Sequence, residues 1–518
     1  MSGLYVFFSL NCTGVKALPP PLTFKKSSFI ELMWAVSLLQ LLQTIAVLGC
    51  ISKVPWIISS LRVGSSEYHP TSSFAQLSLK HSYHDLYCGQ ITQNLHRPHS
   101  VSITEFGAVG DGITPNTYAF QNAIFYLKSF ADKGGAQLYV PRGRWLTGSF
   151  NLTSHLTLYL EEGAIILASQ DPKQWPVIAP LPSYGRGREF SGGRHISLIH
   201  GINLTDVVIT GKNGTIDGQG SVWWDWFHAK TLNHTRGHLV EFIHSQDIIV
   251  SNVTFMNSPF WTIHPVYCRN VVVHGVTILA PADSPNTDGI DPDSCSDVCI
   301  QDCYISTGDD LISIKSGWDE YGIAFAEPSF NIVIHRVVGE TPTSAGIAFG
   351  SEMSGGIHTV HVDSLLIKNC RTGIRLKTAA GRGGFVVNIS ITGTVMHNVV
   401  TAFDFNALYG DHPDDHFDPG AYPVVTGILI ANTVGENISH AGNFQGLAQA
   451  PFKNVCLKNV FLEGNVGGFE WNCSGIEGFS TNVSPPPCPE LQILRDDSGC
   501  YSPVKGRSQV GGLQSESK

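Results

Sequence analysis

Short runs of β-branched residues recur along most of the chain at a constant phase. Each run begins at an asparagine or aspartate, continues with valine and isoleucine, breaks at a polar residue and resumes as a second short run. The copies begin at Asp247, Asn270, Asp297 and Asn331, and weaker ones begin near Val360, Asn388 and Asn454. Because the runs are too short for helices and are rich in Val, Ile and Thr, the pattern predicts β-strands.

The spacing of these runs predicts a stacked architecture. The unit returns about every 22–30 residues, which is typical of a right-handed parallel β-helix, where each coil buries its face only by stacking on its neighbours. A β-propeller needs longer units, of about 40 residues, with WD or kelch signatures that the sequence lacks. A β-sandwich would not explain an Asn or Asp at the same phase of each unit. We therefore expect a single all-β domain, a right-handed parallel β-helix, over residues 101–490.

One segment departs from the strand pattern. Apolar residues lie at helical spacing between Thr117 and Ala131, and Lys133-Gly134-Gly135 ends the run. A helix here would cap the open N-terminal end of the stack and cover its exposed strand edges. The preceding stretch Gly107–Gly112 does not match the GxGxxG pattern of a nucleotide-binding loop and is interpreted as a turn.

The N-terminal residues are typical of an export signal. The stretch from Ile30 to Ser52 is uncharged apart from Glu31 and follows two lysines. We expect residues 1–52 to be a leader that holds a signal peptide or a signal anchor, with Met33 as an alternative start. Residues 53–100 are predicted to be a polar linker, and residues 491–518 a disordered tail.

Composition and charge narrow the class of protein. The 518 residues include 53 glycines, and only 14% are charged, which favours one long neutral-polar repeat over several charge-covered domains. The net charge of −10 disfavours nucleic acid as a partner. It does not exclude an acidic polysaccharide, because the 21 histidines gain positive charge in an acidic medium.

Sequons and cysteines also indicate export. Ten of the 12 cysteines lie beyond the leader, and Cys473, Cys488 and Cys500 predict a disulfide-tied C-terminal end. The cluster Cys295–Cys303 lacks a CxxC pair, so it does not predict a zinc site. Nine Asn-x-Ser/Thr sequons in the expected fold predict N-glycans, at Asn151, Asn203, Asn213, Asn233, Asn252, Asn388, Asn437, Asn472 and Asn482.

Three carboxylates on neighbouring units predict a reactive centre. Asp288 lies in Asn286-Thr-Asp-Gly289, and Asp309 and Asp310 follow one unit later in Gly308-Asp-Asp310. Residues one coil apart lie about 4.8 Å from each other, so the three side chains should converge. Their repulsion raises at least one pKa, which lets one group stay protonated while another is ionised, as cleavage of a glycosidic bond requires.

A pair of cations on a later unit would suit an anionic sugar. Arg375 and Lys377 lie two positions apart on a predicted strand, so both side chains project from the same face. The stretch Asp283–Cys295 lacks the ligand pattern of a calcium loop. We expect neither a metal nor a cofactor.

Taken together, these motifs resemble the polygalacturonase family of pectin-degrading glycoside hydrolases over roughly residues 100–490. The matching motifs are Asn286-Thr-Asp-Gly289, Gly308-Asp-Asp310 and Arg375-Leu-Lys377. Supporting stretches are Thr215–Gly220, Trp223-Trp224, Asn257–Trp261, His264-Pro265 and Gly350–Gly355.

The resemblance implies a right-handed parallel β-helix and inverting hydrolysis of α-1,4-linked galacturonic acid. It implies that Asp309 is the general acid, and that Asp288 and Asp310 activate the attacking water. It also implies that the substrate is bound by Asn286, Arg375 and Lys377, with the two cations on the substrate carboxylate.

The sequence departs from the family pattern at one position. The family has Gly-His-Gly before its Gly-Ser, and that histidine helps to set the protonation state of the acid. Here Ala345 stands at the position of the histidine, or Ser344 if the alignment shifts by one residue. Loss of one acid–base contributor typically costs about 10²–10⁴-fold in rate, so the activity is expected to be lower without being abolished. Three nearby histidines do not fit the spacing, namely His335, His358 and His361.

The expected function is a secreted polygalacturonase-like hydrolase, monomeric, acting on pectin in the plant cell wall. The alternatives are a pectin-binding protein with little turnover, a hydrolase of a decorated pectin such as rhamnogalacturonan or xylogalacturonan, and a form anchored through residues 30–52. A calcium-dependent lyase is the least supported. Inserts around Trp318–Tyr321 and Tyr409–Tyr422 are predicted to wall off one end of a cleft, which favours exo cleavage.

Overall fold

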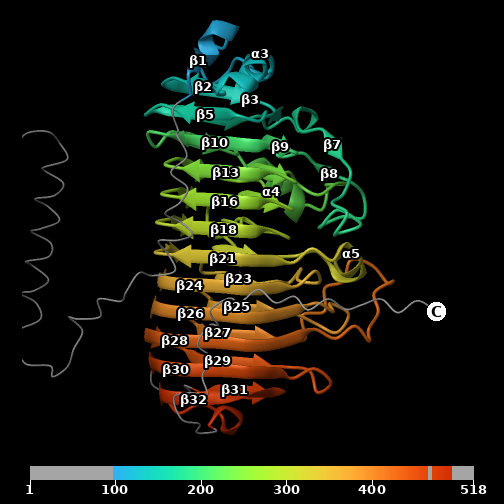
Figure 1. Ribbon diagram of the computed structural model, residues 1–518, viewed down its shortest axis with the longest axis vertical. Helices are drawn as coiled ribbons and strands as arrows, with labels where there is room; N and C mark the ends of the chain where they lie inside the picture. The colour runs from blue at the N-terminus through green and yellow to red at the C-terminus, as the bar shows by residue number, and fades with distance from the viewer. Residues whose placement is uncertain (1–96, 465–469, 493–518) are drawn as a thin grey trace, which may run out of the picture. The chain divides into compact units, whose positions relative to one another are not determined.

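The computed structural model describes residues 97–464 and 470–492, which form a right-handed parallel β-helix (Figure 1). The coils follow one another in chain order along the stack, as the colours of Figure 1 show. The fold begins at β1 (His99–Ser102), within the segment predicted to be a linker, and ends at η5 (Pro489–Leu491). The predictions for the leader, for the linker up to residue 96 and for the tail from residue 493 lie outside the described residues.

The largest sheet has 20 strands, and its neighbouring strands pair in parallel. These strands are β1, β2 (Ala136–Val140), β3 (Gly143–Thr147), β5 (Leu156–Leu160), β6 (Ala164–Ala168), β10 (Thr205–Gly211), β11 (Thr215–Asp217), β13 (Gln246–Ser251), β14 (Thr254–Met256), β16 (Arg269–His274), β17 (Thr277–Leu279), β18 (Ser296–Gln301), β19 (Tyr304–Ser306), β21 (Ser329–His335), β22 (Val338–Glu340), β24 (Ile357–Lys368), β26 (Phe385–His397), β28 (Val424–Ile438), β30 (Phe452–Gly464) and β32 (Ile476–Ser484).

A second face of the stack is built from two shorter sheets. The first holds β4 (Phe150–Asn151), β9 (Ile199–Ile202), β12 (Val240–Ile243) and β15 (Ile263–Val266). The second holds β20 (Ile312–Ile314), β23 (Ala345–Phe349), β25 (Thr372–Lys377), β27 (Thr401–Asn406), β29 (His440–Gln445) and β31 (Trp471–Ser474). Parallel bridges at Ile290 and Asp293 join β15 to β20, so the face is continuous from coil to coil. A short antiparallel pair lies beside it, β7 (Val177–Ile178) with β8 (Arg194–His195).

Columns of aliphatic side chains fill the interior of the stack. In one column, each residue pairs in register with its counterpart on the next coil, so that burial is shared along the axis. Its members are at most 1% exposed: Leu138, Leu158, Ile209, Val250, Val273, Ile300, Ile334, Val362, Ile391, Ile430 and Leu457. This packing explains why each unit of the sequence carries a β-branched run at the same phase.

The recurring Asn and Asp residues mark sharp bends near the start of strands in the largest sheet. Asp247, Asn270, Asp297 and Asn331 all have φ between 53° and 59°, a left-handed conformation that Asn and Asp adopt more readily than most residues. Their side chains also bond from coil to coil, since Asn270 Nδ2 donates to Asp247 Oδ1 at 2.5 Å. The polar phase of the repeat is therefore a stack of left-handed bends within these strands.

The helices lie outside the coils. The predicted helix is present as α3 (Thr117–Leu127), continued by η3 (Lys128–Lys133), and its buried face packs near β2 and β4 at the N-terminal end of the stack (Figure 1). The others are η2 (Ile103–Phe106), η4 (Pro172–Gln174), α4 (Ser221–His228), α5 (Asp319–Phe325) and, at the C-terminal end, η5. Within the described ranges, none of the helices has the length and apolarity needed to cross a bilayer.

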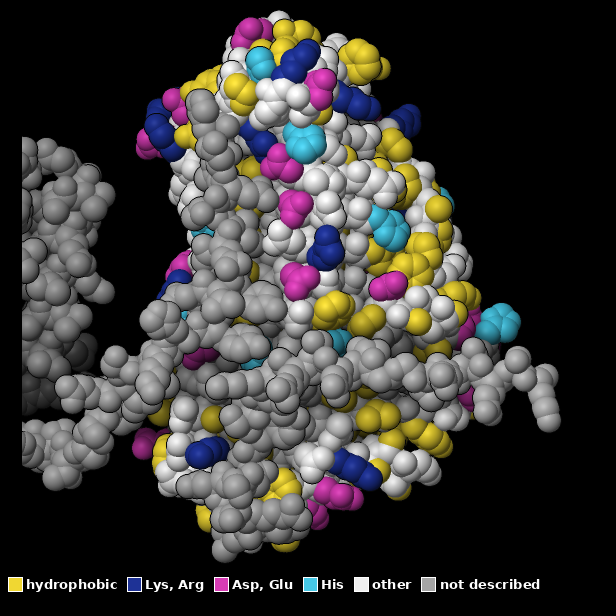
Figure 2. Space-filling model, in the orientation of Figure 1, with side chains coloured by type: hydrophobic (Ala, Val, Ile, Leu, Met, Phe, Trp, Pro, Cys, Tyr) yellow, Lys and Arg dark blue, Asp and Glu magenta, His cyan; other side chains and the backbone are white. Residues whose placement is uncertain are grey.

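The disulfide agrees with the predicted tie at the C-terminal end, and the surface agrees with the neutral-polar composition. Cys473 and Cys488 form a disulfide near the C-terminal end, whereas Cys500 lies outside the described residues. Figure 2 shows that the described part of one face is mostly neutral, with Lys, Arg, Asp and Glu side chains scattered over it. A surface of this kind accounts for the low fraction of charged residues in the sequence.

Candidate active site

A cleft of about 530 Å³ lies over the coils that hold the candidate residues. Asp288 and Asp309 line it from the segments that precede β20, and Arg375 and Lys377 line it from β25. Ser344, which immediately precedes β23, lines it between them. The cleft is therefore assembled from successive coils, and further lining residues come from the loops around them.

The three candidate carboxylates lie close together. The nearest side-chain oxygens of Asp288, Asp309 and Asp310 are all within 4.8 Å of one another. A hydrogen bond from the amide of Gly289 to the carbonyl of Asp310 (3.0 Å) holds the two coils in register at this point. Asp288 and Asp310 are buried, and Asp309 is half-buried and lines the cleft. The structure thus brings together the residues that the sequence placed on neighbouring coils.

Asp310 is held in its ionised form. Lys377 Nζ donates to Oδ2 at 2.7 Å, and Oδ1 accepts from Ser344 Oγ at 2.5 Å and from the amide of Ala345 at 3.0 Å. Burial acts to raise the pKa of Asp310, but the positive charges of Lys377 and Arg375 outweigh it and bring the pKa down to about 2. Asp310 is therefore a carboxylate at neutral and mildly acidic pH.

Asp309 has the opposite character. Burial and the negative charge of Asp310 raise the pKa of Asp309 above its usual value. Its Oδ1 accepts from the amide of Asp310 at 2.8 Å, and its Oδ2 accepts from Asn286 Nδ2 at 3.4 Å. Arg236 fixes the orientation of the Asn286 amide by donating to its Oδ1 at 2.9 Å. The cleft thus holds an acid with a raised pKa next to a carboxylate with a lowered one, as acid–base cleavage requires.

A buried lysine lies beside the third carboxylate. Lys315 Nζ is 3.7 Å from Asp288, 3.6 Å from Asp291 and 3.4 Å from Glu352. Burial and the charge of Asp309 raise the pKa of Asp288 well above its usual range, and burial raises the pKa of Asp291 to about 7. Lys315 opposes both rises, so it limits how many protons this cluster of carboxylates takes up.

The two cations predicted to bind the substrate differ in their surroundings. Lys377 is 7% exposed and is bonded to Asp310, so its charge neutralises a carboxylate of the site itself. Arg375 packs against Tyr409, with its guanidinium carbon 5.7 Å from the ring centre, and its Nε lies 3.6 Å from Asp404. Among the described residues Arg375 Nε has no hydrogen-bond acceptor, and the side chain lines the cleft.

A serine lies next to the acids, and its hydroxyl is bonded to one of them. The Ser344 hydroxyl contacts Asp310, whereas the side chain of Ala345 is fully buried and only its amide reaches that carboxylate. Among the described residues that line the cleft, the single histidine is His412, which is bound to Asp319 at 2.5 Å. The site therefore carries a hydroxyl next to its acids, and an imidazole is not in contact with them.

The two predicted inserts, Trp318–Tyr321 and Tyr409–Tyr422, meet at one wall of the cleft. Arg188 joins them, since it bonds to Asp411 at 2.7 Å and to Glu352 at 2.6 Å and lies 4.2 Å above the ring of Trp318. The Trp318 indole also donates to the carbonyl of Asp411 at 3.0 Å. Figure 1 shows α5 next to the segment that follows β27, in agreement with these contacts. The wall is present, and exo cleavage stays a prediction.

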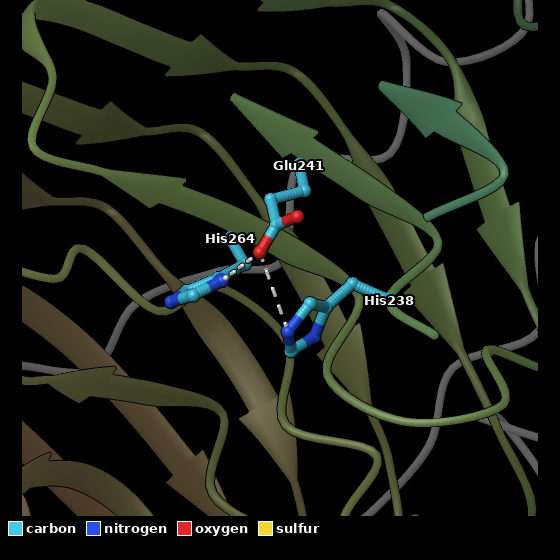
Figure 3. A group of neighbouring side chains, drawn as sticks. All are labelled: His238, Glu241 and His264. Carbon is cyan, nitrogen blue, oxygen red and sulfur yellow. Dashed lines mark hydrogen bonds and ion pairs between the residues drawn. The ribbon is translucent and has the colours of Figure 1, made fainter. Parts of the chain in front are cut away.

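A buried ion-pair network lies next to the cleft (Figure 3). Arg194 donates to both oxygens of Glu241 at 2.7 and 2.8 Å, His264 Nδ1 lies 3.0 Å from Glu241, and His238 lies 3.6 Å from it. Three of these side chains could offer ligand atoms to a metal, but the cation Arg194 already occupies the carboxylate. Both histidines pack on Trp261, which lines the cleft, so the network supports the floor of the site.

Sequence reasoning missed the residues that balance the charge of the acids. Lys315 lies five positions after Asp310 and could have been found as a cation on the same coil. Glu352 lay within a stretch quoted for the resemblance, yet its pairing with Arg188 depends on a loop far away in sequence. The three histidines set aside by the sequence analysis do not line the cleft, namely His335, His358 and His361.

Known proteins have sequences similar to that of this chain. The sequence profile of glycosyl hydrolases family 28 matches residues 186–484, which include every candidate residue of the site. The chain is also 53% identical, over 397 residues, to a probable polygalacturonase of Vitis vinifera. That match covers 76% of this chain and 81% of the relative.

Solved structures share the fold. A hyperthermoactive exopolygalacturonase from Thermotoga maritima matches with a TM-score of 0.66 and 28% identity, over 75% of this chain and 92% of that chain. The polygalacturonase of Erwinia carotovora ssp. carotovora matches with a TM-score of 0.61 and 23% identity, over 75% of this chain and 99% of that chain, and shows the fold alone. The predicted parallel β-helix is confirmed, and the chain belongs to family 28 of the glycosyl hydrolases.

Proposed function

We propose that this glycoside hydrolase cleaves the α-1,4 linkages of polygalacturonate, the acidic backbone of pectin. The observation that carries the proposal is the split protonation of adjacent carboxylates in the cleft. Asp309 has a raised pKa and Asp310 a lowered one, and the guanidinium of Arg375 lines the same cleft. A pectin-binding protein without turnover is not favoured, because binding alone gives no reason to bury three repelling carboxylates.

Each acidic residue has a distinct role in this reaction. Asp309 lines the cleft and protonates the oxygen of the leaving sugar. Asp310 accepts the proton of the attacking water because Lys377 keeps it ionised, and Asp288, whose pKa is raised although Lys315 opposes the rise, helps to position that water. The positive charges of Lys315 and Lys377 thus act on carboxylates of the protein itself.

Substrate binding falls mainly to Arg375. Its planar fork of donors suits a carboxylate, and Tyr409 holds the guanidinium in place by packing beside it. Asn286 lines the cleft as predicted, and its amide nitrogen approaches Asp309 from the substrate side. A galacturonate residue offers one carboxylate to Arg375, which a methyl-esterified residue lacks. We expect de-esterified polygalacturonate to be preferred over decorated pectins.

A single displacement by water is better supported than a covalent intermediate. The nearest oxygens lie within 4.8 Å of one another, which is closer than the roughly 6.5–9.5 Å typical of inverting enzymes and also closer than the roughly 5–5.5 Å of retaining ones. However, a nucleophilic carboxylate needs a free, ionised oxygen towards the sugar. Both oxygens of Asp310 are already hydrogen-bonded, and Asp288 and Asp309 have raised pKa values. Inversion, which the family resemblance implies, fits these constraints.

We also propose that the chain is secreted to the cell wall as a monomeric glycoprotein, with anchoring through residues 30–52 as the alternative. The nine sequons support this proposal. They form two groups, which differ in whether the asparagine Nδ2 atom donates a hydrogen bond. Five are exposed and their Nδ2 atoms donate no hydrogen bond within the described residues: Asn151, Asn203, Asn213, Asn233 and Asn252. In the other four, Nδ2 donates to a neighbouring coil: Asn388, Asn437, Asn472 and Asn482.

Replacing the general acid should abolish most of the activity. Asp309→Asn removes the proton donor while keeping the shape of the side chain, so the rate of reducing-end release from polygalacturonate should fall by about 10²–10⁴-fold or more. The matched control is Asp302→Asn, which removes an exposed aspartate that pairs with Arg336 on an outer turn. Equal activity of wild type and Asp309→Asn would sink the proposed function.

Removing the partner of Asp310 should shift the pH profile. Lys377 lowers the pKa of Asp310, so Lys377→Met should raise that pKa. Because the carboxylate is lost as pH falls through its pKa, the acid limb of kcat/KM should move to higher pH. Lys368→Met, at an exposed position of β24, is the control and should leave the limb in place. An unmoved acid limb in Lys377→Met would contradict the assigned role.

Glycan occupancy should follow the division of the sequons. After expression in a eukaryotic secretory host, peptide mapping of the enzymatically deglycosylated protein should find glycans mainly at the five asparagines with free Nδ2 atoms. At the other four, a glycan would compete with the bond to the next coil, so chains modified there should fold poorly and be under-represented. Full occupancy at Asn437 and Asn472 in active, secreted protein would refute this division.

A further inference from the structure

The Lys and Arg side chains that line the cleft differ in whether the protein supplies them with a counter-ion. Four of them have a carboxylate oxygen 2.6–3.6 Å away, namely Arg188, Lys315, Arg375 and Lys377. The fifth, Arg186, has no carboxylate at ion-pair distance within residues 97–464 and 470–492. Its Nε donates to the carbonyl of Gly187 at 3.2 Å, and its Nη1 donates to the carbonyl of Pro413 at 2.5 Å. Arg186 therefore brings to the cleft a positive charge that no carboxylate of the described residues pairs with.

The position of Arg186 is fixed by a close approach of the chain to α5. The preceding residue, Gly185, has a φ of 69°, and a Cβ atom there would lie 2.2 Å from a ring carbon of Tyr321 in α5. A glycine is therefore required at this position. The Tyr321 hydroxyl donates to Asp414 at 2.8 Å, and the carbonyl of Pro413 on the same insert accepts from Arg186. Arg186 is thus held at the wall where the two inserts meet.

Arg188, two positions later, has the opposite environment. It bonds to Glu352 at 2.6 Å and to Asp411 at 2.7 Å, so carboxylates of the protein neutralise its charge. Arg186 uses two of its five N–H donors on neutral carbonyls, which hold the side chain in place but leave its charge unbalanced. A half-buried cation without a counter-ion is costly, and an anion that binds beside it offsets the cost. The cleft is therefore suited to receive a negatively charged group next to Arg186.

We propose that Arg186 is a specificity-determining residue that binds the carboxylate of a second sugar of the substrate chain. The proposal rests on the proposed function, because polygalacturonate carries a carboxylate on each of its sugars. One sugar presents its carboxylate to Arg375 beside the acids, and another presents its carboxylate to Arg186 at the wall of the same cleft. The planar guanidinium suits a carboxylate at both places. The cleft then selects chains that have two acidic sugars at this spacing.

The kinetic test uses a variant that removes the charge of Arg186 and keeps a donor for the wall. Arg186→Gln retains an amide that can bond to the carbonyl of Pro413. With trigalacturonate as substrate, KM should rise by about 10- to 100-fold and kcat should change little, because a charged hydrogen bond that only binds the substrate is lost. Arg144→Gln, which removes an exposed arginine of β3, is the matched control and should leave both constants in place. An unchanged KM in Arg186→Gln would overturn the proposal, as would a fall in kcat as large as the fall in kcat/KM, which indicates a distorted site.

A second measurement does not depend on turnover. Calorimetric titration of trigalacturonate into Asp309→Asn, with and without Arg186→Gln, should show that the second substitution weakens binding by about 10- to 100-fold at low salt. The difference should shrink as salt is added, because salt screens the attraction between the guanidinium and the carboxylate. Equal affinities, or a difference that salt does not reduce, would overturn the proposal for Arg186. If the affinities differ as expected but the wild type does not cleave polygalacturonate, the proposed hydrolysis fails and the binding role of Arg186 stands.

Discussion

The register of each coil on the next is the constraint on which the site depends. Parallel strands about 4.8 Å apart place residues of the same phase in columns. One such column fills the interior with aliphatic side chains. In the same way, the stacking brings carboxylates together at the surface of the second face. Gly289 and Asp310 are locked together by a backbone hydrogen bond, so Asp288 cannot move away from Asp309 without breaking the stack. The fold therefore fixes the reactive groups through its backbone, and loops add the walls of the cleft.

Crowding carboxylates in this way is costly, and the chain offsets the cost with buried cations. Lys377 neutralises Asp310, and Lys315 lies among three acids at 3.4–3.7 Å. Removing either cation would leave buried charge uncompensated, which is far more destabilising than losing an exposed ion pair. The same cations separate the pKa values of the acids, because Asp310 has a direct lysine partner and Asp309 has none of comparable strength. Stability and reactivity thus share the same contacts.

The fold and the reacting residues were predictable because they follow from short-range patterns. The phase of the Asn and Asp residues predicted the coils, and the spacing between Asp288 and Asp310 predicted their meeting. The partners of those residues were harder to predict. Arg188 reaches Glu352 and Asp411 across more than one loop, and a sequence gives no register for loops. The role of Lys377 was also underestimated, because a strand pattern shows which face a side chain occupies but not which neighbour it binds. Likewise, only the structure distinguishes Ser344, which contacts the acids, from Ala345, which is buried.

The anomeric configuration of the first product tests the central claim most directly, namely that water attacks in a single step with Asp309 as the acid. Proton NMR of early hydrolysis of an α-1,4-linked galacturonide, recorded before mutarotation, resolves the two anomers. We predict that the β-anomer appears first, because a single displacement by water inverts the configuration of the α-linkage. Initial release of the α-anomer would mean that one of the closely spaced aspartates attacks the sugar itself. That result would contradict the assigned roles of the three carboxylates.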